Sequence, residues 1–167
     1  MPKYFIYARK STDEENKQVR SIEDQLTELK DFSQKEKLDV VDVLVEKQSA
    51  KIPGRPIFNT MVDRIKDGEA TGIISWHPDR LARNSIDGGQ IIYLLDKNII
   101  ESLKFPTFWF ENTPQGKFML SLSFGQAKYY VDSLSQNIKR GLNNKAKRGE
   151  VVCVAPPGYT NNRLTKK

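Results

Sequence analysis

The stretch Lys3-Tyr-Phe-Ile-Tyr-Ala8 is a short apolar, aromatic run, typical of a strand buried on both faces of a parallel sheet. Two similar runs follow, the valine-rich Asp39–Glu46 and then Gly72–Trp76. Residues 99–105 and 107–110, which Pro106 separates, are candidate edge strands. These runs predict a mostly parallel central sheet of four to five strands.

Helical spacing of apolar residues fills the intervals between these strands. The predicted helices run from a capping box at Ser21 to about Glu36, from Pro56 to Gly68, and from a cap at Ser85 past Leu95. Strands that alternate with helices predict an α/β fold in which helices flank the sheet.

A longer helical pattern extends from Gly116 to Arg148. Its apolar residues recur four and three positions apart, the spacing of helix-on-helix packing: Leu120, Phe124, Ala127, Val131, Leu134 and Ile138. A helix of about 30 residues is about 45 Å long, whereas a domain of this size is only about 30 Å across. We expect part of the helix to project and its seam to pack against a second subunit. The alternative is that the whole seam packs on its own sheet.

The composition argues against several classes of protein. No apolar run approaches the roughly 20 residues that span a bilayer, and the N-terminus has no signal-peptide pattern, so no membrane contact is expected. The single cysteine, Cys153, cannot form an internal disulfide, which favours the cytoplasm. With one histidine, His77, a zinc site is not expected, and the absence of phosphate-binding glycine motifs predicts no nucleotide cofactor.

Basic charge gathers at one end of the chain. Residues 134–167 hold eight Lys or Arg and one acid, Glu150, and so carry +7, while the other residues carry −1. The basic residues on the last turns of the long helix are Lys139, Arg140, Lys145, Lys147 and Arg148. This clustering favours a polyanion partner, DNA or RNA. A solvated tail is the alternative.

Polar residues that could bind phosphate or take part in catalysis follow the first and third strands. Arg9 and Ser11 come after the first strand, and the group Asp79, Arg80 and Arg83 comes after the third. Parallel strands end at one edge of a sheet, so these side chains, and Arg55 before the second helix, are expected to converge. Arginine binds phosphate oxygens through two parallel hydrogen bonds, and it stabilises the charge that develops in phosphoryl transfer. The pattern predicts a phosphate site beside a serine hydroxyl.

Simpler interpretations remain open for each residue. Ser11 can belong to a turn or a helix cap, and Arg80 and Arg83 can be surface ion-pair partners of nearby acids. A hydrolase triad of Ser11, His77 and Asp79 is a rival, but no nucleophile elbow surrounds the serine, and an Asp two residues after a His is not expected to reach it.

Several motifs carry a resemblance to a known family. Tyr7-Ala-Arg-Lys-Ser11 resembles the Y-A-R-x-S signature of the resolvase/invertase family of serine recombinases, and Asp79-Arg-Leu-Ala-Arg83 resembles their D-R-L-x-R motif. Weaker matches are Ser21-x-x-x-Gln25, Arg55-Pro56, Gly116-Lys117 and Pro156-Pro-Gly-Tyr159, the last typical of the large serine recombinases or integrases. The resemblance spans nearly the whole chain.

The resemblance implies a catalytic domain at 1–115, an interface and DNA-contacting helix at 116–148, and a linker at 149–167 toward a further DNA-binding region. It also implies that subunits, as dimers and as tetramers at synapsis, cut and rejoin double-stranded DNA without ATP or metal. This serves integration, excision, inversion or resolution. The matching positions imply that Ser11 is the nucleophile and that Arg9, Arg80 and Arg83 bind and activate the phosphate. They also imply that Asp79 orients these arginines or assists proton transfer, and that Arg55 and Gln25 support the site.

The chain also departs from the family pattern. Ala127-Lys128-Tyr129 stands where the family often has Ala-Glu-Arg, Asn137 stands at an arginine position, and Glu46 replaces an aspartate. These departures concern the chemistry of the interface and fine regulation more than the nucleophile. Two other functions also stay open. One is a DNA-binding or assembly module that does not cut, and the other is a phosphoryl-transfer enzyme for a small substrate.

Overall fold

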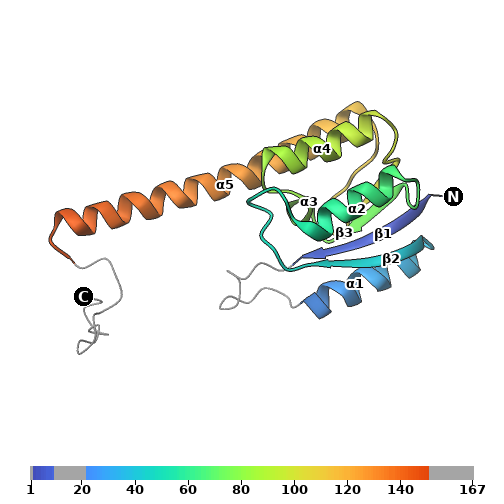
Figure 1. Ribbon diagram of the computed structural model, residues 1–167, viewed down its shortest axis with the longest axis horizontal. Helices are drawn as coiled ribbons and strands as arrows, with labels where there is room; N and C mark the ends of the chain where they lie inside the picture. Colours follow the sequence, from blue (N-terminus) through green and yellow to red (C-terminus); the bar gives the residue numbers. More distant parts are fainter. Residues whose placement is uncertain (1, 10–21, 151–167) are drawn as a thin grey trace. The chain divides into compact units, whose positions relative to one another are not determined.

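A computed structural model describes residues 2–9 and 22–150 of the chain. Within these residues a four-stranded sheet has the order β2-β1-β3-β4, and every neighbouring pair is parallel (Figure 1). The strands are β1 (Lys3–Arg9), β2 (Asp39–Glu46), β3 (Gly72–Ser75) and β4 (Ser102–Lys104). This confirms the predicted α/β fold with a parallel sheet.

Helices cover both faces of the sheet, and the alternation of side chains along β1 shows why its sequence is apolar throughout. Tyr4, Ile6 and Ala8 pack in the cluster that includes α1 (Ile22–Lys35). Phe5 and Tyr7 pack in the larger cluster on the other face. The helices that contribute to that larger cluster are α2 (Pro56–Lys66), α3 (Pro78–Leu81), α4 (Ser85–Asp96) and the first turns of α5 (Pro114–Lys147).

An irregularity in β2 changes which face its residues point to. The register between β1 and β2 shifts between Tyr4 and Phe5, so that Val41 has no direct partner. An extra residue of this kind reverses the in-and-out alternation downstream of it. Val40 and Val43, three positions apart, consequently contact the same α1-side cluster.

Two sequence predictions are corrected near the third and fourth strands. Residues 107–110 form no strand. Pro106 has no amide proton to donate to a strand ladder. The aromatic residues are instead held by side-chain packing, since Phe105 and Phe110 are buried in the core and the Phe108 ring packs edge-on against Phe105 with ring centroids 5.8 Å apart. The cap of α4 is Asn84 rather than Ser85, since the Asn84 side chain accepts hydrogen bonds from the amides of residues 86 and 87. The predicted cap at Ser21 lies outside the described residues.

The long helix α5 belongs to two compact units, residues 1–128 and residues 129–167. In the first unit the seam residues Leu120 and Phe124 are buried in the large core cluster. In the second unit the seam residues Leu134 and Ile138 are 44% and 53% exposed.

Within the part of the chain that the structure describes, no helix has both the length and the apolar character to cross a membrane.

Gly116 is required where α5 begins, and this gives a first prediction. A Cβ atom there would lie 1.9 Å from the Glu111 backbone oxygen, which cannot move aside as a flexible side chain can. Gly116→Ala should therefore lower the free energy of unfolding by about 1–3 kcal/mol, as overpacking usually does, when measured by urea denaturation. In the control Gly125→Ala, on the same helix, the new Cβ meets nothing within 4 Å, and stability should hold or rise. Equal stability of the two variants would contradict the steric argument.

Candidate functional site

The carboxyl ends of β1 and β3 bring Arg9 beside the short helix α3 (Pro78–Leu81). Arg9 is the last residue of β1, is fully buried, and donates from Nε to the Arg80 backbone oxygen at 3.3 Å. Its two terminal nitrogens are also buried and have no hydrogen-bond partner among the described residues. A buried guanidinium with unpaired donors is costly unless an anion accepts from them.

Three further predicted site residues lie in α3 or just after it. Arg83 Nη2 lies 2.8 Å from Asp79 Oδ2, and Arg80 Nε lies 3.8 Å from Asp79 Oδ1. The predicted convergence of Arg9, Arg80, Arg83 and Asp79 at one edge of the sheet is thus present in the structure. Ser11 lies outside the described residues.

His77 also contacts Asp79, although their separation in the sequence predicts no such contact. His77 Nδ1 lies 3.1 Å from Asp79 Oδ1, because the backbone turns into α3 between the two residues and His77 caps that helix. The carboxylate is nevertheless shared with Arg80 and Arg83, so it balances guanidinium charge as well as contacting the imidazole.

The pKa shifts show that positive charges crowd this edge of the sheet. Burial, and then repulsion from Arg83 and Arg80, lower the pKa of Arg9 from 12.5 to about 10. Burial alone would raise the pKa of Asp79, but the His77 hydrogen bond and the charges of Arg80 and Arg83 outweigh it and hold that pKa far below its usual range. Such a cluster favours a bound anion.

The depressed pKa of Asp79 predicts how stability changes in acid. A carboxyl whose pKa is lowered by folding adds stability above its unfolded value near pH 4, and this contribution is lost as the pH falls toward the folded value. Wild type should exceed Asp79→Asn in free energy of unfolding at pH 6, and the gap should narrow steadily from about pH 4 to pH 2. Urea denaturation across this range measures it. A gap that does not change with pH would show that Asp79 is not held ionised by these contacts.

Each of the three side-chain nitrogens of Arg55 donates to a group of the protein. Arg55 is buried, and it donates to Asp87 Oδ2 from Nε at 3.2 Å and from Nη2 at 2.7 Å. It also donates to the Tyr7 hydroxyl at 2.8 Å and to the Leu81 backbone oxygen. Arg55 therefore links elements behind the arginine cluster.

Two more residues with expected roles lie at the same edge. Gln25 is buried in the first turn of α1, the end of that helix that follows the β1 edge. Glu46, the last residue of β2, accepts from the backbone amides of Lys47, Gln48 and Ile57. Its carboxylate thus fixes the loop and the start of α2.

The comparisons with known proteins agree with this geometry. The family model described as "Resolvase, N terminal domain" matches residues 4–151. The chain belongs to the resolvase family of serine recombinases. A search of curated proteins gave no match.

Solved structures share the fold of this resolvase-family chain at low sequence identity. The N-terminal catalytic domain of TP901-1 integrase has 20% identity and a TM-score of 0.57, over 79% of this chain and 98% of that one. A resolvase family site-specific recombinase from Streptococcus pneumoniae has 19% identity and a TM-score of 0.56, over 88% and 99%. The C-terminal catalytic domain of ISC1926 TnpA, an IS607-like serine recombinase, has 19% identity and a TM-score of 0.53, over 85% and 84%.

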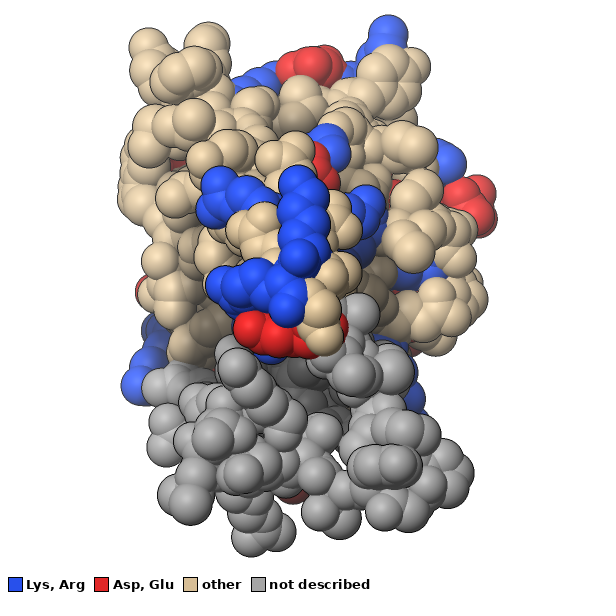
Figure 2. Space-filling view, turned by 90° about the vertical axis from the view of Figure 1, so that its left-hand side faces the viewer, with Lys and Arg blue, Asp and Glu red and all other residues tan. Residues whose placement is uncertain are grey.

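The predicted DNA-binding residues of this resolvase-family chain lie on the last turns of α5 and directly after it. Lys139, Arg140, Lys145, Lys147 and Arg148 are all exposed. Figure 2 looks at this end of the helix and shows Lys and Arg side chains gathered there. Arg148 also pairs with Glu150 at 3.1 Å. A row of basic side chains on one helix end suits a phosphate backbone.

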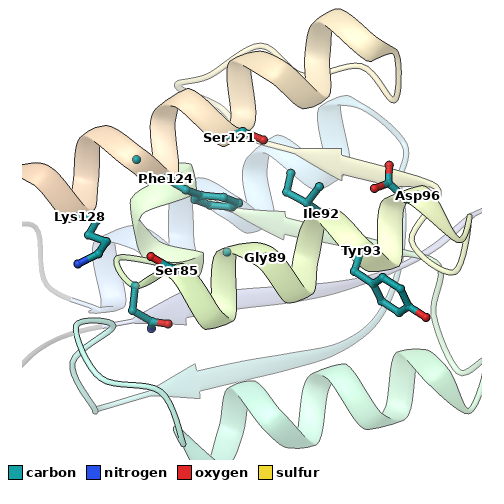
Figure 3. Close-up of a pocket in the computed structure, with 11 residues that line it drawn as sticks. Ser85, Gly89, Ile92, Tyr93, Asp96, Ser121, Phe124 and Lys128 are labelled. Atoms are coloured by element: carbon teal, nitrogen blue, oxygen red, sulfur yellow. The ribbon is translucent and has the colours of Figure 1, made fainter.

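A hollow of about 440 Å³ lies between α4 and α5 (Figure 3). Phe124 and Ile92 give it an apolar lining, and Lys128 and Asp96 add one charge of each sign. None of its lining residues is an arginine. The arginine cluster, rather than this hollow, therefore remains the candidate site of chemistry in the resolvase-family chain.

Proposed function

We propose that this chain is the catalytic part of a site-specific DNA recombinase and that Ser11 is its nucleophile. Membership of the resolvase family supports site-specific recombination in general. The observation that carries the finer proposal is the buried Arg9 guanidinium, whose terminal nitrogens have no partner among the described residues and which lies beside Arg80 and Arg83. A DNA phosphate supplies acceptors for these two Arg9 nitrogens and a negative charge beside the three guanidinium groups.

The proposed step is a transesterification at phosphorus. The Ser11 oxygen forms a bond to the scissile phosphorus and gives up its proton, while the bond from phosphorus to the DNA 3′ oxygen breaks. The 3′ oxygen leaves as a hydroxyl after it takes up a proton, and the DNA 5′ end remains attached as a phosphoserine ester. One phosphodiester replaces another, so the reverse step can reseal the strand without ATP.

Each residue of the cluster has a separate task in this proposal. Arg9, Arg80 and Arg83 neutralise the nonbridging oxygens, whose charge must be stabilised in the transition state. Asp79 orients Arg83 and Arg80 through its carboxylate, and it can also take part in proton transfer. Arg55 and Gln25 support the site from behind, since Arg55 directs its donors to protein groups.

The proposal also assigns the parts of the chain and their partners. Residues 1–115 are the catalytic part, residues 116–148 provide contacts with DNA and with other subunits, and residues 149–167 lead toward a DNA-binding region. The exposed basic end of α5 supports double-stranded DNA as the partner. The exposed apolar residues Leu134, Ile138 and Leu142 support self-association, as a dimer and as a tetramer when two sites meet.

Covalent capture from random-sequence DNA tests this function whatever the target sequence is. The full chain is incubated with a pool of random-sequence duplexes, the mixture is denatured, and DNA that stays bound to protein is sequenced. Mass spectrometry of the digested adduct should find a nucleotide attached to the peptide that contains Ser11. Attachment at another residue would overturn the nucleophile assignment. Salt-sensitive binding without any adduct would instead favour the non-cutting DNA-binding module.

A further inference from the structure

Arg55 and Asp87 form a buried ion pair next to the arginine cluster, and this pair takes no direct part in the proposed phosphoryl transfer. Asp87 lies in the first turn of α4, its side chain is almost fully buried, and its Oδ2 lies 2.7 Å from Arg55 Nη2. The same oxygen accepts from Arg55 Nε at 3.2 Å and from Asn84 Nδ2 at 2.7 Å. Three donors on one carboxylate oxygen fix the position of the Arg55 guanidinium.

Arg55, once fixed, holds the two segments that carry the phosphate-binding arginines. Its Nη1 donates to the Tyr7 hydroxyl, two residues before Arg9 on the same side of β1. Its Nη2 donates to the backbone oxygen of Leu81, which lies between Arg80 and Arg83. One planar group therefore contacts both strand ends from which the cluster is built.

Asn84 extends the same network to a third segment. Its Nδ2 donates to the Ala50 backbone oxygen at 3.0 Å, and that oxygen also accepts from the Arg83 amide at 3.2 Å. Ala50 is buried in the connection between β2 and α2. Strand β1, the connection after β2 and the segment after β3 are thus joined through Asp87 and its two partners.

We propose that Asp87 is a positioning residue for DNA cleavage, which acts through Arg55 and Asn84 to set the spacing of Arg9, Arg80 and Arg83. This inference rests on the proposed function, because positions matter only if the arginines hold a reacting phosphate. Asp87 itself touches no substrate. Preorganised donors stabilise a transition state only while they are held at fixed positions, and displacement by a fraction of an ångström weakens them.

The first test removes the charge of Asp87 with little change of shape. Asp87→Asn should lower the single-turnover rate of adduct formation at least about tenfold, on a duplex recovered from the random pool. Its dissociation constant for that duplex should stay within about threefold of wild type. The matched control is Asp96→Asn on the same helix, where the acid pairs with Lys117 at 2.8 Å away from the cluster. This control should change neither quantity, and an Asp87→Asn rate equal to that of the control would overturn the proposal.

A second variant separates positioning from stability. Apolar replacement of both partners of a buried ion pair often preserves stability, since no unpaired charge is left. Arg55→Met with Asp87→Leu should therefore remain folded, although the Tyr7 hydroxyl and the Leu81 oxygen lose a donor, and should cleave at least about tenfold more slowly. A stable double variant that cleaves at the wild-type rate would overturn the positioning role. The double variant also carries the test if Asp87→Asn does not fold.

Different results would overturn the proposed function and the positioning role of Asp87. Absence of a Ser11 adduct in the wild-type chain would overturn the proposed function, and the role of Asp87 with it. A normal wild-type adduct together with unchanged Asp87 variants would overturn the positioning role alone.

Discussion

Ser11→Ala is expected to reduce covalent capture of DNA by about 10⁴-fold or more, as removal of a nucleophile does in other enzymes that form covalent intermediates. The arginine cluster would still bind phosphate, so the dissociation constant for a recovered duplex should change little. A denaturing gel measures the adduct, and a filter-binding titration measures the affinity.

Ser33→Ala is the matched control for this substitution. The Ser33 hydroxyl is buried in α1 and donates to the Lys30 backbone oxygen, so its loss removes one local hydrogen bond and touches no anion site. The control should form the adduct at the wild-type rate. Equal adduct from Ser11→Ala and from this control would assign the nucleophile to another residue.

Arg9→Met is expected to lower the cleavage rate by about 10²–10³-fold, the usual cost of losing one preorganised donor in a catalytic site. The same change should not destabilise the fold. Lowering of the Arg9 pKa to about 10 corresponds to roughly 3 kcal/mol of unfavourable free energy for its charged form. Methionine fills similar space without a charge, so the melting temperature should hold or rise.

Arg64→Met should show the opposite pattern and serves as the comparison. Arg64 pairs with Asp42 at 2.6 Å and with Glu69 at 2.8 Å, and its guanidinium stacks over the Phe5 ring. Its replacement should leave cleavage unchanged and lower the melting temperature. A loss of stability in Arg9→Met larger than that in Arg64→Met would mean that Arg9 is primarily a structural residue.

The sheet and the arginine cluster were predictable because both follow from local sequence. A strand covered on both faces must be apolar throughout, and Tyr4 to Ala8 satisfy this with buried side chains on each face. Residues that directly follow parallel strands meet at one edge, so Arg9 and Arg80 could be placed together from the order of the strands. The strand predicted at residues 107–110 was wrong because aromatic residues such as Phe105 and Phe110 can be buried without forming a strand.

The support behind the cluster was not predictable in the same way. Asp87 is 32 positions from Arg55, and an acid in the first turn of a helix is ordinarily explained by the helix dipole. The contact between His77 and Asp79 depends on the turn into α3, which the residue types alone do not specify. The Asp87–Arg55 contact depends on long-range packing, and the His77–Asp79 contact depends on loop geometry. Neither leaves a periodic pattern in the sequence.

The extra residue in β2 has a consequence for length variation in this part of the chain. Upstream of Val41 and downstream of it, β2 presents valines to α1, and only the irregularity between them makes this compatible with Glu46 facing the start of α2. Deletion of one residue there would either expose Val40 to water or turn Glu46 away from the backbone amides that it accepts from. Gains and losses of single residues should therefore be tolerated in the surface turns and excluded from residues 40–46.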